Sequence, residues 1–494
     1  MTAATALLDV VPRRRLAPRL PDLAGTWWLA ALTTGVVTFG SLLVVVGTPL
    51  VRLPLALAFG FALAMVTLAR PAAGVLVAVG YLVLLAFLRR LLIPTTGWWQ
   101  TDPLLLVGPF VAALLIVKLF VLERRPVAPD RLSKLVLVFL LVSIVEVANP
   151  AGGGPGVGIV GLLYAAVPLL WFFIGRELLE DASVERLLQL VVGLGLVVAA
   201  YGLVQTEFGQ PSWDREWVNL AGYDALHVGD VVRPFGTFSS SAEYALFVGS
   251  AFVVAVALTL RGRALALLAL PPLAVALFLA SARAALITAA FAAIVLMGLR
   301  TLRPWRALAV ILVAAALAFA ALEVFGSSLS SGAGSGNQLV SHQLGGITDP
   351  LDPNSSTLLL HFAIVIDGVK WSIHHPLGQG TASTNVGGVS RGSGDHAAGS
   401  TEVDVSNAFV AFGPAGGLLY LAIIVMVLFR AARCYFAGRP IMLPIIGVLV
   451  VGLGQWLIGG HYALAPVTWL LIGAVAAMAA RTPRRRRLVD PAPR

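Results

Sequence analysis

The chain has 494 residues, of which 59% are hydrophobic and only 12% charged, and its mean hydropathy is +0.91. This composition excludes a water-soluble globular protein, because no soluble core of this size needs so much apolar surface. The net charge of +10 does not indicate nucleic acid as a partner, since the basic residues are scattered in short clusters rather than gathered on one domain. Membrane lipid is therefore the expected surrounding of most of the chain.

About fourteen apolar runs follow one another, each close to the roughly 20 residues that cross a bilayer as a helix. They predict an all-α fold, a polytopic transmembrane helix bundle of about 12–14 spans with a large, partly helical extracytoplasmic loop. The runs begin near Trp27, Leu53, Ala72, Leu104, Leu135, Val157, Leu187, Phe238, Ala264, Ala284, Ala307, Ala408, Ile441 and Tyr462.

Arginine clusters fall on alternate connections between these runs, which is the pattern of cytoplasmic loops. Both termini carry such clusters and are predicted to be cytoplasmic. No small-residue cleavage site follows the first cluster, so the first run is expected to be a retained helix. The preference for arginine over lysine, with abundant Ala, Gly and Val, suggests a high-GC bacterium and hence a multi-pass protein of the bacterial inner or plasma membrane.

The stretch from Ala264 to Leu299 is too long for one crossing and is interrupted at Pro271-Pro272 and at Ser281-Ala282-Arg283. Arg261 and Arg303 flank it and should lie on the same side of the membrane. Two short crossings with a turn between them are therefore predicted.

Two outside loops are long enough to form a site, and they set the expected division of the chain. The second loop opens with a Gly- and Ser-rich linker at 326–336, continues with an interfacial helix over Thr357 to His374, and stops that helix at Pro376. The predicted divisions are a cytoplasmic tail at 1–26, a transmembrane bundle at 27–325 that includes the outer loop 207–237, the large extracytoplasmic loop at 326–406, C-terminal transmembrane helices at 407–480, and a basic cytoplasmic tail at 481–494.

Two outside arginines are the leading candidates for binding a substrate. Arg233 stands where the first outer loop enters the membrane, and Arg283 lies between two apolar crossings. An ionised side chain at membrane depth marks a functional site more often than a structural one. Because a guanidinium stays charged when desolvated and grips phosphate oxygens with two hydrogen bonds, the pair suits a lipid diphosphate. Arg52, Arg89 and Arg90 are interpreted instead as interfacial residues or lipid-headgroup contacts.

The four candidates for a catalytic base are His375, His396, Glu402 and Asp404, all in or just after the second outer loop. Neutral imidazole or a carboxylate can take the proton of an attacking hydroxyl. A metal site from His374, His375, Asp395 and His396 matches no zinc motif, so no metal is expected.

Four short motifs resemble those of the O-antigen ligase and O-antigen polymerase-like membrane glycosyltransferases, over about 40% of the chain. They are Arg233-Pro-Phe-Gly-Thr-Phe238, Ala282-Arg283-Ala284, His375-Pro-Leu-Gly-Gln-Gly380, and Asn407 with Gly413 and Gly416. The resemblance implies that Arg233 and Arg283 bind the diphosphate of a polyprenyl-linked glycan donor, with Gly236, Thr237 and Asn407 as further substrate-binding residues. The family often has a His before the Asn, where this chain has Ser406, so the identity of the base stays open.

The expected function is transfer of a sugar chain from a polyprenyl-diphosphate donor to an acceptor hydroxyl on a glycan or lipid-glycan, outside the cytoplasm, in cell-surface polysaccharide biosynthesis. The diphosphate is already a good leaving group, so no cofactor is expected. A lipid-linked glycan flippase or polysaccharide exporter would also need a basic cavity, but should hold charges within several spans. A purely structural membrane protein would have no use for Arg283 between apolar crossings.

Overall fold

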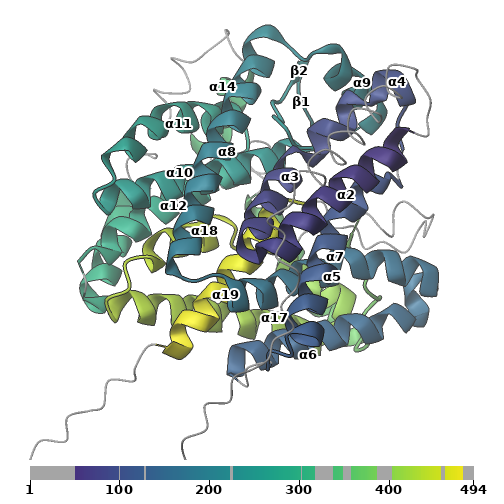
Figure 1. The fold of residues 1–494 in the computed structure, drawn as a ribbon. Coiled ribbons are helices and arrows are strands. Elements are labelled where there is room, and N and C mark those ends of the chain that lie inside the picture. The colour runs from purple at the N-terminus through teal and green to yellow at the C-terminus, as the bar shows by residue number, and fades with distance from the viewer. Residues whose placement is uncertain are drawn as a thin grey trace, which may run out of the picture.

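The structure is a computed structural model, and it confirms an all-α helix bundle whose described part includes one two-stranded hairpin (Figure 1). Helices dominate because the bilayer offers backbone groups no hydrogen-bond partner, so each apolar segment must satisfy its own. The described residues are 51–99, 101–126, 130–222, 226–301, 303–317, 338–348, 358–385, 403–457 and 462–481.

The first half of the described chain forms long helices joined by short turns. Its helices are α2 (Arg52–Ala69), α3 (Pro71–Leu91), α4 (Ile93–Thr96), η3 (Pro103–Leu106), α5 (Val107–Ile116), η4 (Val117–Leu122), α6 (Arg131–Val145), η5 (Glu146–Ala148), η6 (Pro150–Gly152), α7 (Pro155–Leu178) and α8 (Asp181–Phe208). The first outer loop then folds into α9 (Ser212–Ala221) and a hairpin of β1 (His227–Val228) and β2 (Val231–Val232), which the sequence analysis did not predict.

The second half contains the break that was predicted between Ala264 and Leu299. Its helices are α10 (Ser241–Leu260), η8 (Ala264–Ala269), α11 (Leu270–Leu279), α12 (Arg283–Leu299), an apolar helix at Pro304–Leu317, α14 (Gln338–Thr348), α15 (Leu358–His374), α17 (Asp404–Phe436), α18 (Met442–Val451) and α19 (Leu464–Arg481). The turn between α11 and α12 confirms two short segments, and α15 confirms the predicted helix in the second outer loop.

Eight helices among the described residues are long and apolar enough to cross a membrane, and four shorter apolar helices accompany them. Every predicted run from Leu53 onward contains a helix, whereas the run near Trp27 lies outside the described residues. The linker at 326–336 also lies outside them. The chain is thus a polytopic membrane protein, as its composition indicated.

The centre of the bundle is formed by α10 and α19, the most deeply buried of the long apolar helices. Glycines allow α19 to pack directly on α7. A Cβ atom at Gly473 would lie 2.1 Å from the carbonyl oxygen of Phe172, and one at Gly175 would lie 2.2 Å from that of Leu470. Small residues permit this close backbone approach, which is how helices in lipid gain packing energy.

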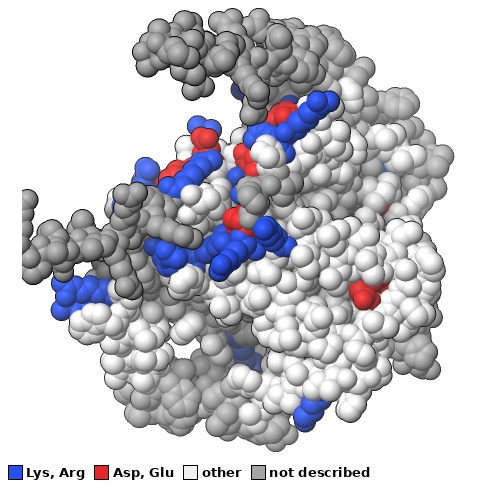
Figure 2. Space-filling model, turned by 90° about the horizontal axis from the view of Figure 1, so that it is seen from below, with Lys and Arg blue, Asp and Glu red and all other residues white. Residues whose placement is uncertain are grey.

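One end of the bundle is joined by ion pairs between connections that the charge pattern assigned to a single side. Asp130, at the start of α6, lies 2.5 Å from Arg430 of α17 and 3.3 Å from Arg176 of α7. Glu185 of α8 lies 2.8 Å from Arg261, directly after α10. Figure 2 shows basic side chains gathered beside acidic ones on this underside, next to a wide uncharged surface. These connections therefore share one face, here called the basic face.

Candidate functional site

Arg233 is positioned by the hairpin of the first outer loop. The hairpin turns at Gly229, whose φ of +57° is a left-handed conformation that suits glycine. Arg233 follows β2 directly, and its backbone N–H donates to the carbonyl oxygen of Leu226 at 2.8 Å. The arginine side chain is half-buried. The hairpin therefore fixes the backbone of Arg233 at the start of the loop that leads to α10.

Arg283 is positioned by the sharp turn that separates α11 from α12. Ser281, in this turn, has a φ of +52°, which is uncommon for a residue other than glycine. Arg283 is the first residue of α12, and its side chain is half-buried. Strained backbone such as that of Ser281, two residues before a half-buried arginine, is common at functional sites.

His342 of α14 bonds Arg283, and the sequence analysis did not select this histidine. Nη2 of Arg283 donates to Nε2 of His342 at 2.7 Å, while Nδ1 of His342 lies 2.8 Å from the hydroxyl of Ser281. A guanidinium can only donate, so Nε2 must be the acceptor and Nδ1 must carry the proton. The Ser281 hydroxyl then donates to the carbonyl oxygen of Leu339 at 3.3 Å.

The charge around His342 keeps its imidazole neutral. Burial, followed by the positive charges of Arg283 and Arg233, lowers the pKa of His342 from 6.5 to about 4. Both guanidinium groups therefore lie near enough for their charges to act on this ring, although 50 positions of sequence separate them. The three side chains form a cationic cluster, here called the arginine–histidine cluster.

Helix α14 completes the cluster because it docks on the hairpin and on α11 and α12 (Figure 1). The Gln338 side-chain oxygen accepts the backbone N–H of Asp230 at 3.2 Å, which ties the start of α14 to the hairpin turn. A sequence signal for α14 exists in the apolar spacing of Leu339, Val340 and Leu344, but the segment is short and lies within a long polar loop.

The loop after Arg233 is held from beneath by buried side chains. Gln205 of α8 accepts the backbone N–H groups of Phe235 and Gly236 at 3.0 and 2.8 Å. Arg90 of α3 donates to the carbonyl oxygens of Gly236, at 2.5 Å, and of Phe238. The Thr237 hydroxyl donates to Val83 at 2.8 Å. Gly236 and Thr237, both predicted to bind substrate, are therefore buried parts of the support for Arg233.

Asp214 of α9 anchors this support. Its carboxylate lies 2.8 Å from Nε of Arg90 and accepts hydrogen bonds of 2.7 Å from both Gln205 and Tyr201. The Arg90 side chain is 1% exposed and that of Asp214 is 0% exposed, so the pair has no contact with lipid headgroups. A buried guanidinium requires such a carboxylate, because an unpaired charge in a dry interior is strongly unfavourable.

The interpretation of Arg52, Arg89 and Arg90 as interfacial or headgroup-binding residues is therefore wrong. Arg52 and Arg89 both pair with Asp102, and their side chains are 0% and 6% exposed. Arg89 also lies over the Trp98 ring at 4.4 Å. Their position near helix ends suggested an interfacial role, but the fold turns them inward toward a carboxylate rather than outward.

The other predicted residues lie elsewhere or outside the described part. His375 is exposed, stacks on Trp371 at 3.9 Å between ring centroids, and bonds the carbonyl oxygen of the same residue. Asp404 is buried and accepts hydrogen bonds from the Tyr420 hydroxyl at 3.0 Å and the Leu457 N–H at 2.5 Å. His396 and Glu402 lie outside the described residues.

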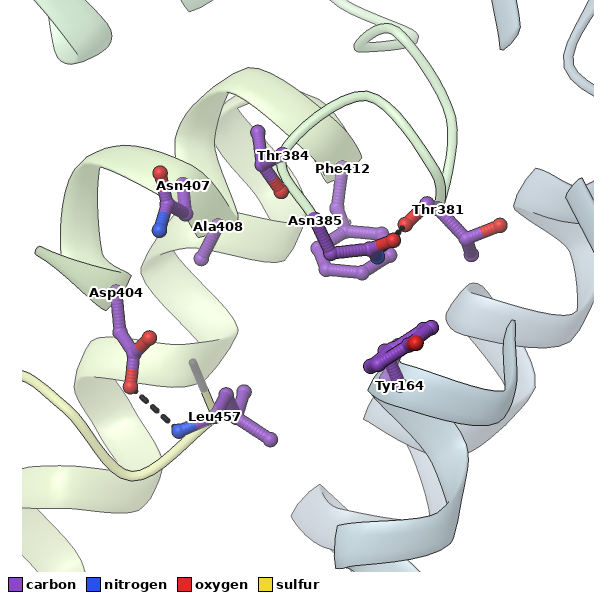
Figure 3. A pocket seen from close by; sticks show the side chains of 10 residues that line it. Tyr164, Thr381, Thr384, Asn385, Asp404, Asn407, Ala408, Phe412 and Leu457 are labelled. Carbon is purple, nitrogen blue, oxygen red and sulfur yellow. Dashed lines mark hydrogen bonds between the residues drawn. The ribbon is translucent and has the colours of Figure 1, made fainter. Parts of the chain in front are cut away.

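A separate pocket contains Asp404 and Asn407 (Figure 3). Its wall is built from α7, from the segment after α15, from the start of α17 and from Leu457. The lining residues are Tyr164, Ala165, Thr381, Thr384, Asn385, Asp404, Asn407, Ala408, Phe412 and Leu457.

No group of three or more His, Cys, Asp or Glu side chains that could hold a metal ion occurs within the described ranges. Comparison of the chain with family models, with curated proteins and with solved structures returned no match. The resemblance to the O-antigen ligase and polymerase-like family therefore stays a prediction based on the four motifs.

Proposed function

We propose that the protein is a membrane glycosyltransferase that moves a sugar chain from a polyprenyl-diphosphate donor to an acceptor hydroxyl. The observation that supports the proposal is the hydrogen bond between Arg283 and His342, with Arg233 near enough for its charge to act on the same ring. Two guanidinium groups around a neutral imidazole form a site for a strongly charged anion with an adjacent proton acceptor. A sugar diphosphate fits this arrangement, because the guanidinium groups can bind its phosphate oxygens and the imidazole can accept the proton of the attacking hydroxyl.

In the proposed reaction the acceptor oxygen attacks the anomeric carbon of the donor sugar, and the bond from that carbon to the diphosphate oxygen breaks. The bonding electrons leave on the lipid diphosphate, whose growing charge Arg233 and Arg283 stabilise. The acceptor proton goes to Nε2 of His342. Because Arg283 turns to the bound diphosphate, this nitrogen is released from its present hydrogen bond.

Donor binding also makes His342 a better base. In the free protein the two arginine charges help to hold its pKa at about 4. A bound diphosphate neutralises these charges and raises the pKa toward its ordinary value. The base therefore becomes effective only once the donor is in place, which protects the lipid-linked sugar from loss before the acceptor arrives.

The reaction is placed on the extracytoplasmic face of a bacterial plasma membrane. The arginine–histidine cluster lies near the start of α10 and α12, whereas Arg261 and Arg300 follow the ends of these helices. At 1.5 Å per residue, the 20 residues of α10 span about 30 Å. The positive-inside rule assigns the basic face to the cytoplasm and the cluster to the opposite side.

The test is transfer activity of Arg233→Lys and Arg283→Lys with a purified lipid-linked donor. Lysine keeps the charge but cannot form the bidentate hydrogen bonds of a guanidinium, so each variant should lose transfer activity about 10- to 100-fold. Arg263→Lys is the matched control, because this side chain is 62% exposed on the basic face and should transfer normally. Full activity of both site variants in protein that inserts normally would refute the proposal.

The alternative is a flippase or exporter, which would hold charges within its spans. Such charges exist in Arg52, Arg90 and Glu243. Each is buried against a partner, however, since Glu243 accepts the Ala463 N–H at 3.2 Å and the arginines pair with carboxylates, so they line no path through the bundle. Liposomes with donor supplied only on the outer face discriminate the two, because an exporter would move glycan without forming a new glycosidic bond.

A further inference from the structure

The turn between α11 and α12 contains a serine where the end of a helix usually has glycine. Helix α11 ends at Leu279, Ala280 follows in a helical conformation, and Ser281 then takes a φ of +52°. Glycine is the usual residue at this position, because a Cβ atom makes the left-handed conformation unfavourable. Among the described residues other than glycine, only Arg124 shares a positive φ. The side chain of Ser281 therefore has a backbone strain to offset.

The hydroxyl of Ser281 offsets this strain by bonding α14 twice. The side chain is 1% exposed, and its oxygen accepts the Nδ1–H of His342 at 2.8 Å. The same hydroxyl donates its own proton to the carbonyl oxygen of Leu339 at 3.3 Å. Leu339 precedes His342 by about one helical turn, so both bonds meet the same face of α14. The hydroxyl is thus fixed as an acceptor toward the ring, since its single proton is directed elsewhere.

The other ring nitrogen of His342 is the one that the proposed reaction uses. Nε2 accepts a hydrogen bond from Arg283 at 2.7 Å in the free protein, and in the proposed reaction it takes the acceptor proton. Before that step the ring must carry its proton on Nδ1, because a protonated Nε2 has no lone pair to offer. Arg283 stops enforcing this tautomer when it turns to the diphosphate. Among the described residues, the Ser281 hydroxyl is then the remaining hydrogen-bond partner of the ring.

We propose that Ser281 is a positioning residue for the transfer reaction, whose hydroxyl holds His342 in the tautomer that can accept a proton at Nε2. The proposal rests on the proposed function, because it adds a second residue to the same base. The hydrogen bond made by one ring nitrogen decides which of the two carries the proton. When Nε2 gains the acceptor proton, the ring becomes a cation and its Nδ1–H bond to Ser281 becomes charge-assisted and stronger. Ser281 itself neither gains nor loses a proton.

The first experiment is nitrogen NMR of the full-length protein in nanodiscs with isotope-labelled histidine, at about pH 8, where imidazole is neutral. Ring nitrogens with and without a proton have widely separated chemical shifts, and the signals of His342 are those that His342→Gln removes. Arg283→Met takes away the guanidinium that bonds Nε2, so Ser281 alone should keep the proton on Nδ1. Ser281→Gly in the same background should release the tautomer and give a signal for protonated Nε2. The proposal is overturned if the double variant keeps the tautomer of Arg283→Met.

The second experiment compares transfer by Ser281→Ala and Ser281→Gly. Both variants lose the hydroxyl, but glycine also removes the strain of a φ of +52°. Loss of a hydrogen bond to a group that becomes charged should lower kcat of each variant about 10- to 100-fold. KM for the donor should change little, because the hydroxyl bonds the imidazole rather than the donor.

Ser341→Ala is the matched control for the second experiment. This exposed serine precedes His342 directly, and its hydroxyl donates to the carbonyl oxygen of Gln338 within α14 at 3.1 Å. The variant removes a serine hydroxyl from the same helix without touching the ring, so it should keep the kcat of the parent protein.

The outcomes separate a positioning role from a merely structural one. Normal kcat in Ser281→Gly would overturn the proposal, since the hydroxyl would then be dispensable. A rise of KM with unchanged kcat would also overturn it, because Ser281 would then serve donor binding by placing α14. The nitrogen spectra require neither donor nor transfer. They therefore test Ser281 even if the arginine variants retain full activity and refute the proposed function.

Discussion

Single arginines at similar depth in this protein do different things because their partners differ. Arg52, Arg89 and Arg90 each face a buried carboxylate, and their charge is used to hold helices together. The partner seen for Arg283 is a neutral imidazole, which an incoming anion can replace at little electrostatic cost. Arg52, Arg89 and Arg90 are thus both buried and paired with a carboxylate, whereas Arg233 and Arg283 are half-buried.

The pKa of His342 leads to a prediction about pH. The neutral form of the free protein prevails above a pKa of about 4, so kcat/KM should stay level down to about pH 5 and fall only below it. The bound diphosphate raises this pKa, so kcat should fall at a higher pH than kcat/KM does. His342→Gln should lower the transfer rate and abolish the fall of both kcat and kcat/KM at low pH.

His374→Gln provides the control for this measurement, because His374 is exposed at the end of α15. Its two pH profiles should match those of the parent protein. An acid limb of kcat/KM centred near pH 6.5, the ordinary value for His, would show that the arginines do not act on the base.

At the scale of the elements, the turns between helices position the arginine side chains. The loop from Arg233 to Phe238 carries one arginine, and α3, α8 and α9 hold it through Arg90, Gln205 and Asp214. Gly236 packs tightly against α10, because a Cβ atom there would lie 2.7 Å from the Tyr244 ring. Its φ of +51° also favours glycine.

Gly236→Ala should therefore displace the loop and with it Arg233. The expected result is a large loss of transfer together with about 1–3 kcal/mol of stability, measured by thermal unfolding in detergent. Gly209→Ala isolates the effect of backbone strain, because Gly209 has a φ of +76° with no atom within 4 Å of the added carbon. Equal activity of the two variants would show that the contact with Tyr244 has no part in placing Arg233.

At the scale of the whole molecule, charge divides the bundle into two ends. The basic face is held by ion pairs such as Asp130 with Arg430, while the opposite end carries the arginine–histidine cluster and the hairpin. In the proposed function, the basic end faces anionic headgroups of the cytoplasmic leaflet and the opposite end carries out the transfer.

A labelling experiment tests the predicted orientation. Asp230→Cys in the hairpin should react with a membrane-impermeant maleimide added to intact cells, whereas Arg263→Cys should react only after the membrane is opened. Both positions are exposed, and Cys434→Ala provides a background free of the native thiol, which is only 2% exposed. Labelling of Arg263→Cys alone in intact cells would reverse the assignment of the two faces.

Much of the architecture was predictable because hydropathy and positive charge act on each segment separately. The runs from Leu53 onward, the turn before Arg283 and the helix ending at His374 needed no knowledge of distant contacts. The choice of Arg233 and Arg283 as a pair followed in the same way, from charges left at membrane depth.

The tertiary structure alone decided which residue accompanies the arginines. His342 meets Arg283 across 59 positions of sequence, through a short helix that is placed only by docking on other elements. Burial likewise turned Arg90 from a surface residue into the support of a loop 146 positions away. Such contacts depend on how helices pack and not on the character of either segment, so composition and spacing could determine the helical segments but could not select the partners within the site.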